Sequence, residues 1–134
     1  MINNIGIGQG YTRPHEVSAE MLREQFEVNV IGPQLVSKAF LPLVQASEKK
    51  TIVNVYVNLS ISRRDADGSS SIAGSITYND GRYPWMVPAY GSSKAALNFL
   101  TREWAKDLNP EGFTVIALYP GVWPPPEKLL TISG

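Results

Sequence analysis

The sequence predicts an α/β layered fold, in which long helices cover a parallel sheet. Two apolar segments rich in β-branched residues, 51–57 and 113–119, are typical of buried strands. A helical segment, 89–108, lies between them, and strands joined through a helix of this length pair in parallel with a right-handed crossover. Because both strands are apolar throughout, we expect both faces of the sheet to be covered.

A second long helix is predicted near 18–46. Ser18 is a suitable N-cap and Glu20 suits the positive end of the helix dipole. Apolar residues then recur at helical spacing up to Val44, but Gly32-Pro33 predicts a kink or break on the way. The first 14 residues are rich in Asn and Gly and are predicted to form a loop.

The helix at 89–108 shows an apolar stripe and a clear stop. The stripe consists of Leu97, Leu100, Trp104 and Leu108, and Asn109 to Gly112 end the helix. Residues 58–83 are polar and lack any period, and a loop of this length is often functional. With 134 residues the chain forms one domain at most. Two strands and two helices are too few to bury such a sheet, so we expect further protein, from an upstream segment or a partner, to complete it.

Composition excludes several classes of function. Twelve Lys and Arg balance twelve Asp and Glu without a basic stripe, which argues against nucleic acid as a partner. The absence of cysteine excludes thiolate chemistry, and the single histidine, His15, excludes a His-rich metal site, so no metal is expected. His15 is predicted to lie in a loop. No apolar run is long enough to span a membrane and the start lacks a secretory pattern, so we expect a cytoplasmic protein.

Tyr90 and Lys94 are the residues best suited to chemistry. Four residues apart on a helix, they lie on one face. A tyrosine hydroxyl, whose ordinary pKa is about 10, is a poor base at neutral pH, but a neighbouring ammonium favours the phenolate. The pair therefore provides a general acid/base. The bare Tyr-x-x-x-Lys pattern also arises by chance, as a surface tyrosine beside a solvated lysine.

The residues around this pair extend the pattern. Pro88 to Asn98 read Pro-Ala-Tyr-Gly-Ser-Ser-Lys-Ala-Ala-Leu-Asn, which resembles the active-site helix of the short-chain dehydrogenase/reductase family. Asn3 to Gly6 resemble the Asn-Asn-Ala-Gly of the same family. Further matches follow in the family's order, at 26–33, 51–55, 70–75 and 117–121. Ordered matches are more specific than one motif, so the chain is identified as a member of this family.

The resemblance implies a fold and an activity. The fold would be a partial Rossmann-like unit, a doubly wound parallel sheet with flanking helices that is truncated at both ends, in a single partial domain over 1–134. The activity would be reduction of a small-molecule carbonyl or oxidation of an alcohol, with NAD or NADP as cofactor. In the family the two long helices pack against a second subunit, which implies a homo-oligomer.

The resemblance also implies catalytic roles. Tyr90 would exchange the proton with the substrate oxygen, and Lys94 would favour its phenolate and hold the nicotinamide ribose. Ser71 would hydrogen-bond the substrate carbonyl, and Asn29 would order a water in the proton relay. Asn29 has the alternative of capping the kink before Gly32-Pro33. Ser71 has alternatives among its neighbouring serines, which are Ser60, Ser62, Ser69, Ser70 and Ser75.

Three further residues are implied at the cofactor. Asn3 would face it, or else brace the turn after a strand. Pro120 and Gly121 stand at the strand end that touches the nicotinamide in the family. Tyr90 and Lys94 would complete the cofactor-binding residues, since Lys94 would hold the nicotinamide ribose.

The chain also departs from the family pattern. The family's glycine-rich phosphate loop is missing, and the Gly-x-Gly-x-Gly at 6–10 lacks both the spacing and a preceding strand. Residues 56–69 resemble an insertion that moves Ser71 away from the strand end. A truncated or mispredicted gene product is one explanation. We therefore expect weak NAD(P) binding by these residues alone, and the alternative function is a non-catalytic remnant that is stable only as an oligomer or with a partner.

Overall fold

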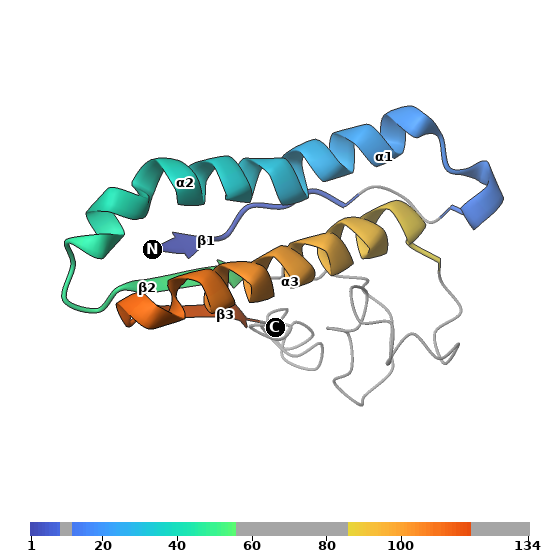
Figure 1. Cartoon of the computed structure of the whole chain (residues 1–134). Coiled ribbons are helices and arrows are strands. Elements are labelled where there is room, and N and C mark those ends of the chain that lie inside the picture. The colour runs from blue at the N-terminus through green and yellow to red at the C-terminus, as the bar shows by residue number, and fades with distance from the viewer. Residues whose placement is uncertain (9–11, 56–85, 119–134) are drawn as a thin grey trace, which may run out of the picture.

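A three-stranded parallel sheet forms one layer of the protein (Figure 1). The computed structural model describes residues 1–8, 12–55 and 86–118. The strands are β1 (Ile2–Asn3), β2 (Thr51–Val55) and β3 (Thr114–Leu118), in the order β1-β2-β3. Both pairs are parallel, and Ile2, Val53 and Ile116 stand side by side in the register. The predicted parallel α/β fold is thus confirmed.

β1 corrects the prediction that the first 14 residues form a loop. Ile2 and Asn3 pair with Val53 and Asn54, and the backbone N–H of Val53 donates to the carbonyl of Met1. A strand of two residues is too short to show the alternation by which strands are found in a sequence.

His15 lies exposed in a short 3-10 helix, Pro14–Glu16.

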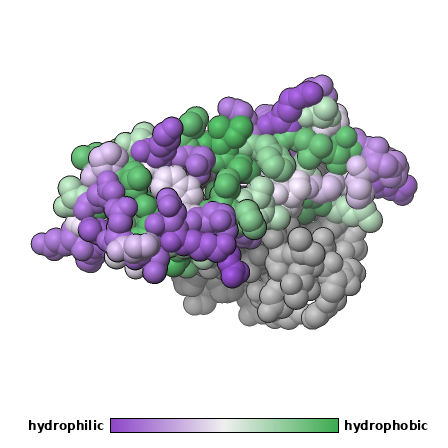
Figure 2. Space-filling model, viewed as in Figure 1, coloured by the Kyte–Doolittle hydropathy of each residue, from purple (hydrophilic) through white to green (hydrophobic). Residues whose placement is uncertain are grey.

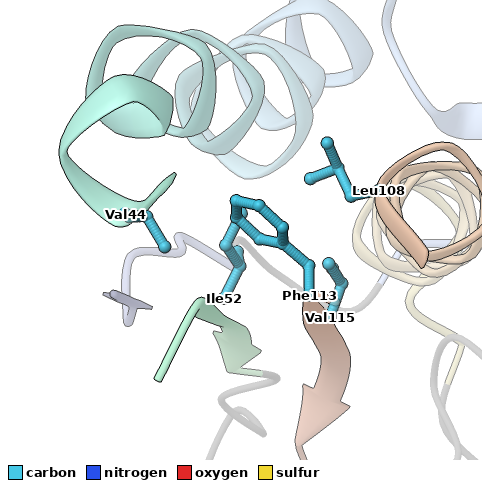
Figure 3. Packing of buried hydrophobic residues seen from close by; sticks show 5 residues of the cluster. All are labelled: Val44, Ile52, Leu108, Phe113 and Val115. Carbon is cyan, nitrogen blue, oxygen red and sulfur yellow. The ribbon is translucent and has the colours of Figure 1, made fainter. Parts of the chain in front are cut away.

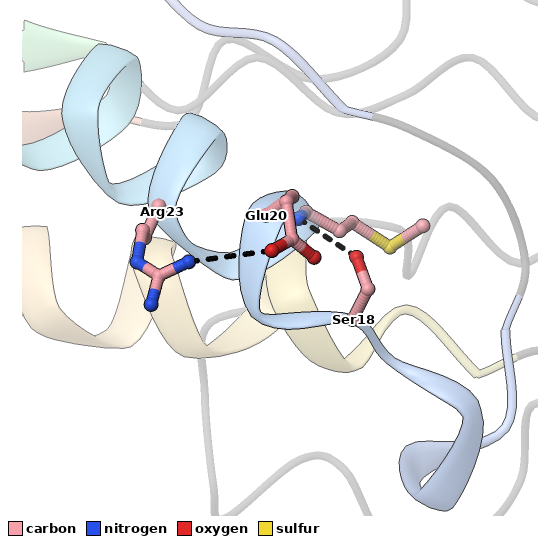
Figure 4. Close-up of polar contacts among 4 residues, drawn as sticks. Ser18, Glu20 and Arg23 are labelled. Atoms are coloured by element: carbon pink, nitrogen blue, oxygen red, sulfur yellow. Dashed lines mark hydrogen bonds and ion pairs between the residues drawn. The ribbon is translucent and has the colours of Figure 1, made fainter.

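The first helical rod is made of three continuous pieces, α1 (Ala19–Phe26), a π-helical turn (Glu27–Ile31) and α2 (Gly32–Gln45). As predicted, Ser18 is the N-cap: its hydroxyl accepts a hydrogen bond of 3.1 Å from the Met21 N–H (Figure 4). Glu20 pairs with Arg23 one turn on. Of the predicted kink or break at Gly32-Pro33, the break is wrong, because the helix widens into a π-helical turn just before Gly32 and continues into α2.

Pro33 gives a physical reason for this widening. It has no N–H to donate to the carbonyl of Asn29, four residues back, so the α-helical pattern of bonds cannot run through this point. The Gly32 N–H bonds instead to the carbonyl of Glu27, the longer step of a π-helix. The proline then fits into the first turn of α2, where a missing donor costs little.

The second rod is α3 (Pro88–Leu108), one residue longer at its start than predicted. A 3-10 turn (Asn109–Glu111) and Gly112, in the left-handed conformation, end it as expected. The Trp104 indole N–H donates to the side-chain oxygen Oε1 of Gln34 at 2.6 Å, which joins the two rods.

The apolar core lies between the rods and the amino ends of β2 and β3 (Figure 3). Val44 at the end of α2 and Leu108 at the end of α3 meet Ile52, Phe113 and Val115 there. Both rods therefore cover the same face of the sheet.

The opposite face of the sheet is exposed among the described residues. Ile116 is 42% exposed, and Leu118 and Ile2 are exposed as well, as expected for strands that need further protein to cover both faces. Large apolar side chains are also exposed on the rods, and Figure 2 shows hydrophobic residues along α1 and α2. None of the described helices has the length and apolar character that a membrane crossing requires.

Candidate active site

Tyr90 and Lys94 lie in the first turns of α3, near the carboxyl ends of the parallel strands. Gly6 and Ile7, which follow β1, and Asn29, in the π-helical turn, converge on the same place. Ligands of open parallel α/β sheets bind at this edge, outside the carboxyl ends of the strands. The fold thus brings Tyr90, Lys94 and Asn29 into one cluster.

Asn29 ties three segments of the chain together. Its side-chain oxygen accepts from the Ile7 N–H at 2.8 Å, and its amide donates to the Ile7 carbonyl at 2.8 Å and to the Ser93 hydroxyl at 3.0 Å. The side chain is completely buried. Since a buried amide must satisfy its hydrogen bonds to be tolerated, these partners fix the position of the segment after β1 against α3.

Lys94 brings a cation into this buried cluster. Its side chain is only 1% exposed, and its Nζ lies 5.6 Å from the centre of the Tyr90 ring. Tyr90 is buried as well. Because burial removes water from the ammonium, it lowers the pKa of Lys94 from its ordinary value of 10.5. The alternative of a surface tyrosine beside a solvated lysine is therefore wrong here.

Asn3 belongs to a second polar group under the helices. Its amide donates to the Ser37 hydroxyl at 3.0 Å and to the Asn54 side-chain oxygen at 2.8 Å. Asn54 in turn donates to the Thr101 hydroxyl at 2.8 Å. The chain of bonds links both rods to β1 and β2 and fits the bracing alternative for Asn3. Its role toward a cofactor stays a prediction.

Three of the predicted site residues, Ser71, Pro120 and Gly121, lie outside the described residues, as do the 56–69 segment and the long polar loop. Two residues of the cluster were not singled out from the sequence. Ser93 is buried, accepts from Asn29 and donates to the Tyr90 carbonyl at 2.8 Å. Its only signal in the sequence was its place directly before Lys94 in the Tyr-x-x-x-Lys segment.

Gly6 is the other residue that sequence reasoning did not assign. A Cβ built on it would lie 2.9 Å from the Lys94 Nζ and 3.3 Å from the Asn29 side-chain oxygen. Within the described ranges, acidic residues and histidine form no cluster that would hold a metal ion.

The described residues thus form a parallel α/β sheet with a buried Tyr-x-x-x-Lys pair at its carboxyl edge. Comparison with known proteins shows the family in which this arrangement is found. The family model of the short chain dehydrogenases matches residues 70–126. An uncharacterised oxidoreductase of Schizosaccharomyces pombe is 34% identical over 119 residues, which cover 89% of this chain and 40% of the relative.

Solved structures show the same likeness. An NADPH-bound carbonyl reductase from chicken fatty liver matches 90% of this chain with a TM-score of 0.70 and 29% identity, over 44% of its own length. An oxidoreductase of this family from Brucella ovis, in complex with a partially ordered NAD, matches 89% at a TM-score of 0.66 and 30% identity, over 47% of its length. The chain belongs to the short-chain dehydrogenase/reductase family and spans less than half the length of these relatives.

Proposed function

We propose that this chain carries the proton-transfer half of an NAD(P)-dependent oxidoreductase, which reduces a small-molecule carbonyl or oxidises an alcohol with Tyr90 as the acid/base. The observation that carries the proposal is the burial of Tyr90 and Lys94 together at the carboxyl edge of the sheet. A tyrosine and a lysine without a joint function would not need to be buried together. Burial of the lysine ammonium costs free energy, and such costly burial is typical of functional sites.

The two side chains support each other as a charge pair. Burial disfavours the ammonium of Lys94 and equally a phenolate at position 90. At a separation of a few ångströms in a medium of low dielectric, opposite charges stabilise each other strongly. A protonated Lys94 would therefore favour the state in which Tyr90 has given up its proton, compared with the same tyrosine without a neighbouring cation. Tyr90 takes a proton from an alcohol in that state and returns it to a carbonyl oxygen in the reverse direction.

The described residues fit one end of a nicotinamide cofactor. Lys94 lies at the carboxyl edge of the sheet, where nucleotides bind in open α/β folds, and would hold a ribose hydroxyl there; the cofactor, when bound, would supply or accept the hydride. The phosphate end is not matched by these residues. Among the described residues, the first α-helix after Gly6 and Gly8 is α1, which begins only at Ala19, so it does not directly follow these glycines as the helix of a phosphate loop would. Which of NAD and NADP is used follows from residues outside this site.

Asn29 and Ser71 complete the proposed machinery. The side chain of Asn29 is already hydrogen-bonded to Ile7 and Ser93. In the proposed proton relay, the main-chain carbonyl of Asn29 would therefore hold the water. Pro33 has no N–H to give to that carbonyl, which leaves it suited to accept from a water. Ser71 would hydrogen-bond the substrate carbonyl, as in the family.

The test is turnover by a protein that contains these residues together with a phosphate-binding segment, either a longer form of this chain or a fusion. NADH- and NADPH-dependent reduction of carbonyl compounds is measured by absorbance. Tyr90→Phe should lower kcat by at least about a hundredfold, since general acid/base catalysis contributes about that much or more. Ser92→Ala, which removes an exposed hydroxyl from the same helical turn, is the matched control.

Two outcomes would contradict the proposal. Tyr90→Phe with most of its activity left would show that another group transfers the proton. A well-folded protein that binds cofactor but reduces no carbonyl would favour the alternative, a non-catalytic remnant.

A cytoplasmic location stays a prediction that fractionation of the cell would test.

The exposed helical faces support a homo-oligomer as the assembled form. Leu43 on α2 is 67% exposed and Phe99 on α3 is 66% exposed, and Leu35 and Phe40 are exposed beside them along α2. Apolar surface of this extent marks a protein interface. Sedimentation of the purified chain should give a dimer or larger species, and Leu43→Lys with Phe99→Lys should shift it toward monomer. A wild-type monomer with a cooperative thermal transition would contradict this.

A further inference from the structure

We propose that Gly6 is a positioning residue for Lys94: the absent side chain at Gly6 leaves the space in which the Lys94 ammonium lies beside Tyr90. The proposal deepens the function above and rests on it for the meaning of the Tyr90–Lys94 pair. The packing that it describes is tested without cofactor or turnover.

The geometry places the Gly6 α-carbon directly against the end of the lysine. A Cβ there would lie 2.9 Å from Nζ and 3.7 Å from Cε of Lys94, and the first of these distances is shorter than atoms of this kind tolerate. The backbone of Gly6 does not have a positive φ, so alanine would meet no conformational strain at this position. The requirement for glycine therefore comes mainly from the space that Nζ occupies, with the Asn29 side-chain oxygen, at 3.3 Å from the added Cβ, as a second and less severe neighbour.

The segment that holds Gly6 is fixed on its other side. The neighbouring Ile7 uses both its N–H and its carbonyl to bond to Asn29, and Asn29 is bonded to Ser93 on α3. The Gly6 backbone therefore cannot retreat from α3 without breaking these bonds. The flexible end of the lysine would have to move instead, away from its place 5.6 Å from the Tyr90 ring centre.

The residue before Gly6 provides a contrast within the same segment. Ile5 is 52% exposed, so a large side chain is accepted one position earlier. Gly32, in the first rod, offers a second contrast, because a Cβ built there would have ordinary contact at 3.6 Å with the carbonyl of Glu27. Gly32→Ala makes the same chemical change without touching Lys94.

The experiment follows the ring of Tyr90 and the ε-carbon of Lys94 by NMR of the full chain with ¹³C-labelled tyrosine and lysine. Tyr90→Phe and Lys94→Met identify the two signals by their loss. We expect Gly6→Ala to displace both signals, while Gly32→Ala and Ile5→Ala leave them in place. Both signals unchanged in Gly6→Ala would overturn the proposal.

A double-mutant cycle keeps the proposal testable if Gly6→Ala folds poorly. Methionine lacks Nζ, so Gly6→Ala should lower the unfolding midpoint in the wild-type background and lose most of that effect with Lys94→Met. Recovery of a folded protein in the double variant would support the proposal. An equal loss in both backgrounds would overturn it, because the clash would then lie with something other than the ammonium. Since no cofactor is present, this failure is distinct from failure of the catalytic proposal.

Discussion

The two ends of the sheet are buried by opposite kinds of residue. At the amino ends of β2 and β3, Ile52, Phe113 and Val115 pack with Val44 and Leu108 in an apolar core. Near the carboxyl ends, the fully buried side chains are largely polar, and they include Gln25, Asn29, Ser93 and Lys94. The same two helical rods cover both regions.

The difference separates stability from chemistry within one layer. Apolar burial at the amino end contributes free energy without needing partners. Polar burial at the carboxyl end costs free energy unless specific hydrogen bonds satisfy it: Asn29 has such bonds, whereas the Gln25 side-chain amide has no partner among the described residues, and the burial of Lys94 opposes folding. We therefore expect substitutions at the first end to change stability, and those at the second to change the position or ionisation of single groups.

The largest expected effect is at the amino end. Ile52 is 1% exposed, so Ile52→Ala should lower the free energy of unfolding by about 2 to 5 kcal/mol through lost burial and the cavity left behind. Denaturant unfolding measures this loss.

Ile116, on the neighbouring strand, provides the control for Ile52. It is 42% exposed, so Ile116→Ala removes the same atoms from a site that is partly in water already. Its effect should be clearly smaller. Equal losses would show that the exposed face of the sheet is covered in solution and would remove the asymmetry between the two sites.

Asn29→Ala should have a medium effect, which is local to the carboxyl end. The half-buried N–H and carbonyl of Ile7 would lose their partner, at up to about 1 to 3 kcal/mol for an unsatisfied group. Amide hydrogen exchange at Ile7 should accelerate. Asn54→Ala, which breaks the other polar group, should destabilise the chain while Ile7 stays protected. Acceleration at Ile7 in both variants would mean that the two groups act as one network.

Sequence reasoning worked where residues repeat and where a motif is long. The helical spacing correctly predicted both rods, and the β-branched runs correctly predicted β2 and β3. The extended pattern around Tyr90 correctly predicted the family. It missed β1, which is too short for a period, and the π-helical turn, which depends on a proline four residues after Asn29.

The candidate site was only partly predictable for a similar reason. Gly6 and Lys94 are far apart in the sequence, and their contact arises only when β1 and α3 come together. The polar character of the buried helix face was also missed. Apolar periodicity indicates the face that leaves water, yet Leu35 and Leu43 are exposed here while Ser37 is buried between them.

A smaller effect is expected in the pH dependence of stability. Burial lowers the pKa of Lys94 in the folded state below its ordinary value of 10.5. Between these two pKa values the unfolded chain binds more protons than the folded one, so stability rises with pH in that window. Below it, both states are protonated and the full cost of burying the ammonium applies.

Lys94→Met isolates this contribution. Both proteins carry Tyr90→Phe, so that the phenol at position 90 does not titrate. At pH values below the window, the protein with Lys94→Met should be more stable than its parent with Lys94. The difference from its parent should shrink as pH rises toward 10.5. Unfolding by denaturant across this range measures it. A difference that stays constant with pH would mean that Lys94 keeps its ordinary pKa in the folded chain.

The smallest expected effect is that of a nicotinamide cofactor on the 134-residue chain alone. The carboxyl end offers Lys94 to a ribose, and a hydrogen bond to a charged group contributes about 1.5 to 3 kcal/mol. Association costs about 4 to 15 kcal/mol, so one or two such contacts leave the Kd at about 1 mM or weaker. NADH or NADPH at about a tenth of that concentration would stabilise the chain by less than about 0.1 kcal/mol.

Calorimetric titration and a thermal shift assay measure this binding, with reduced nicotinamide mononucleotide as the control. If these residues hold only the nicotinamide end, the mononucleotide and the dinucleotides should bind equally weakly. Micromolar binding of a dinucleotide, but not of the mononucleotide, would show that the chain has a phosphate site of its own, and the polar end of the sheet would then be a complete cofactor site.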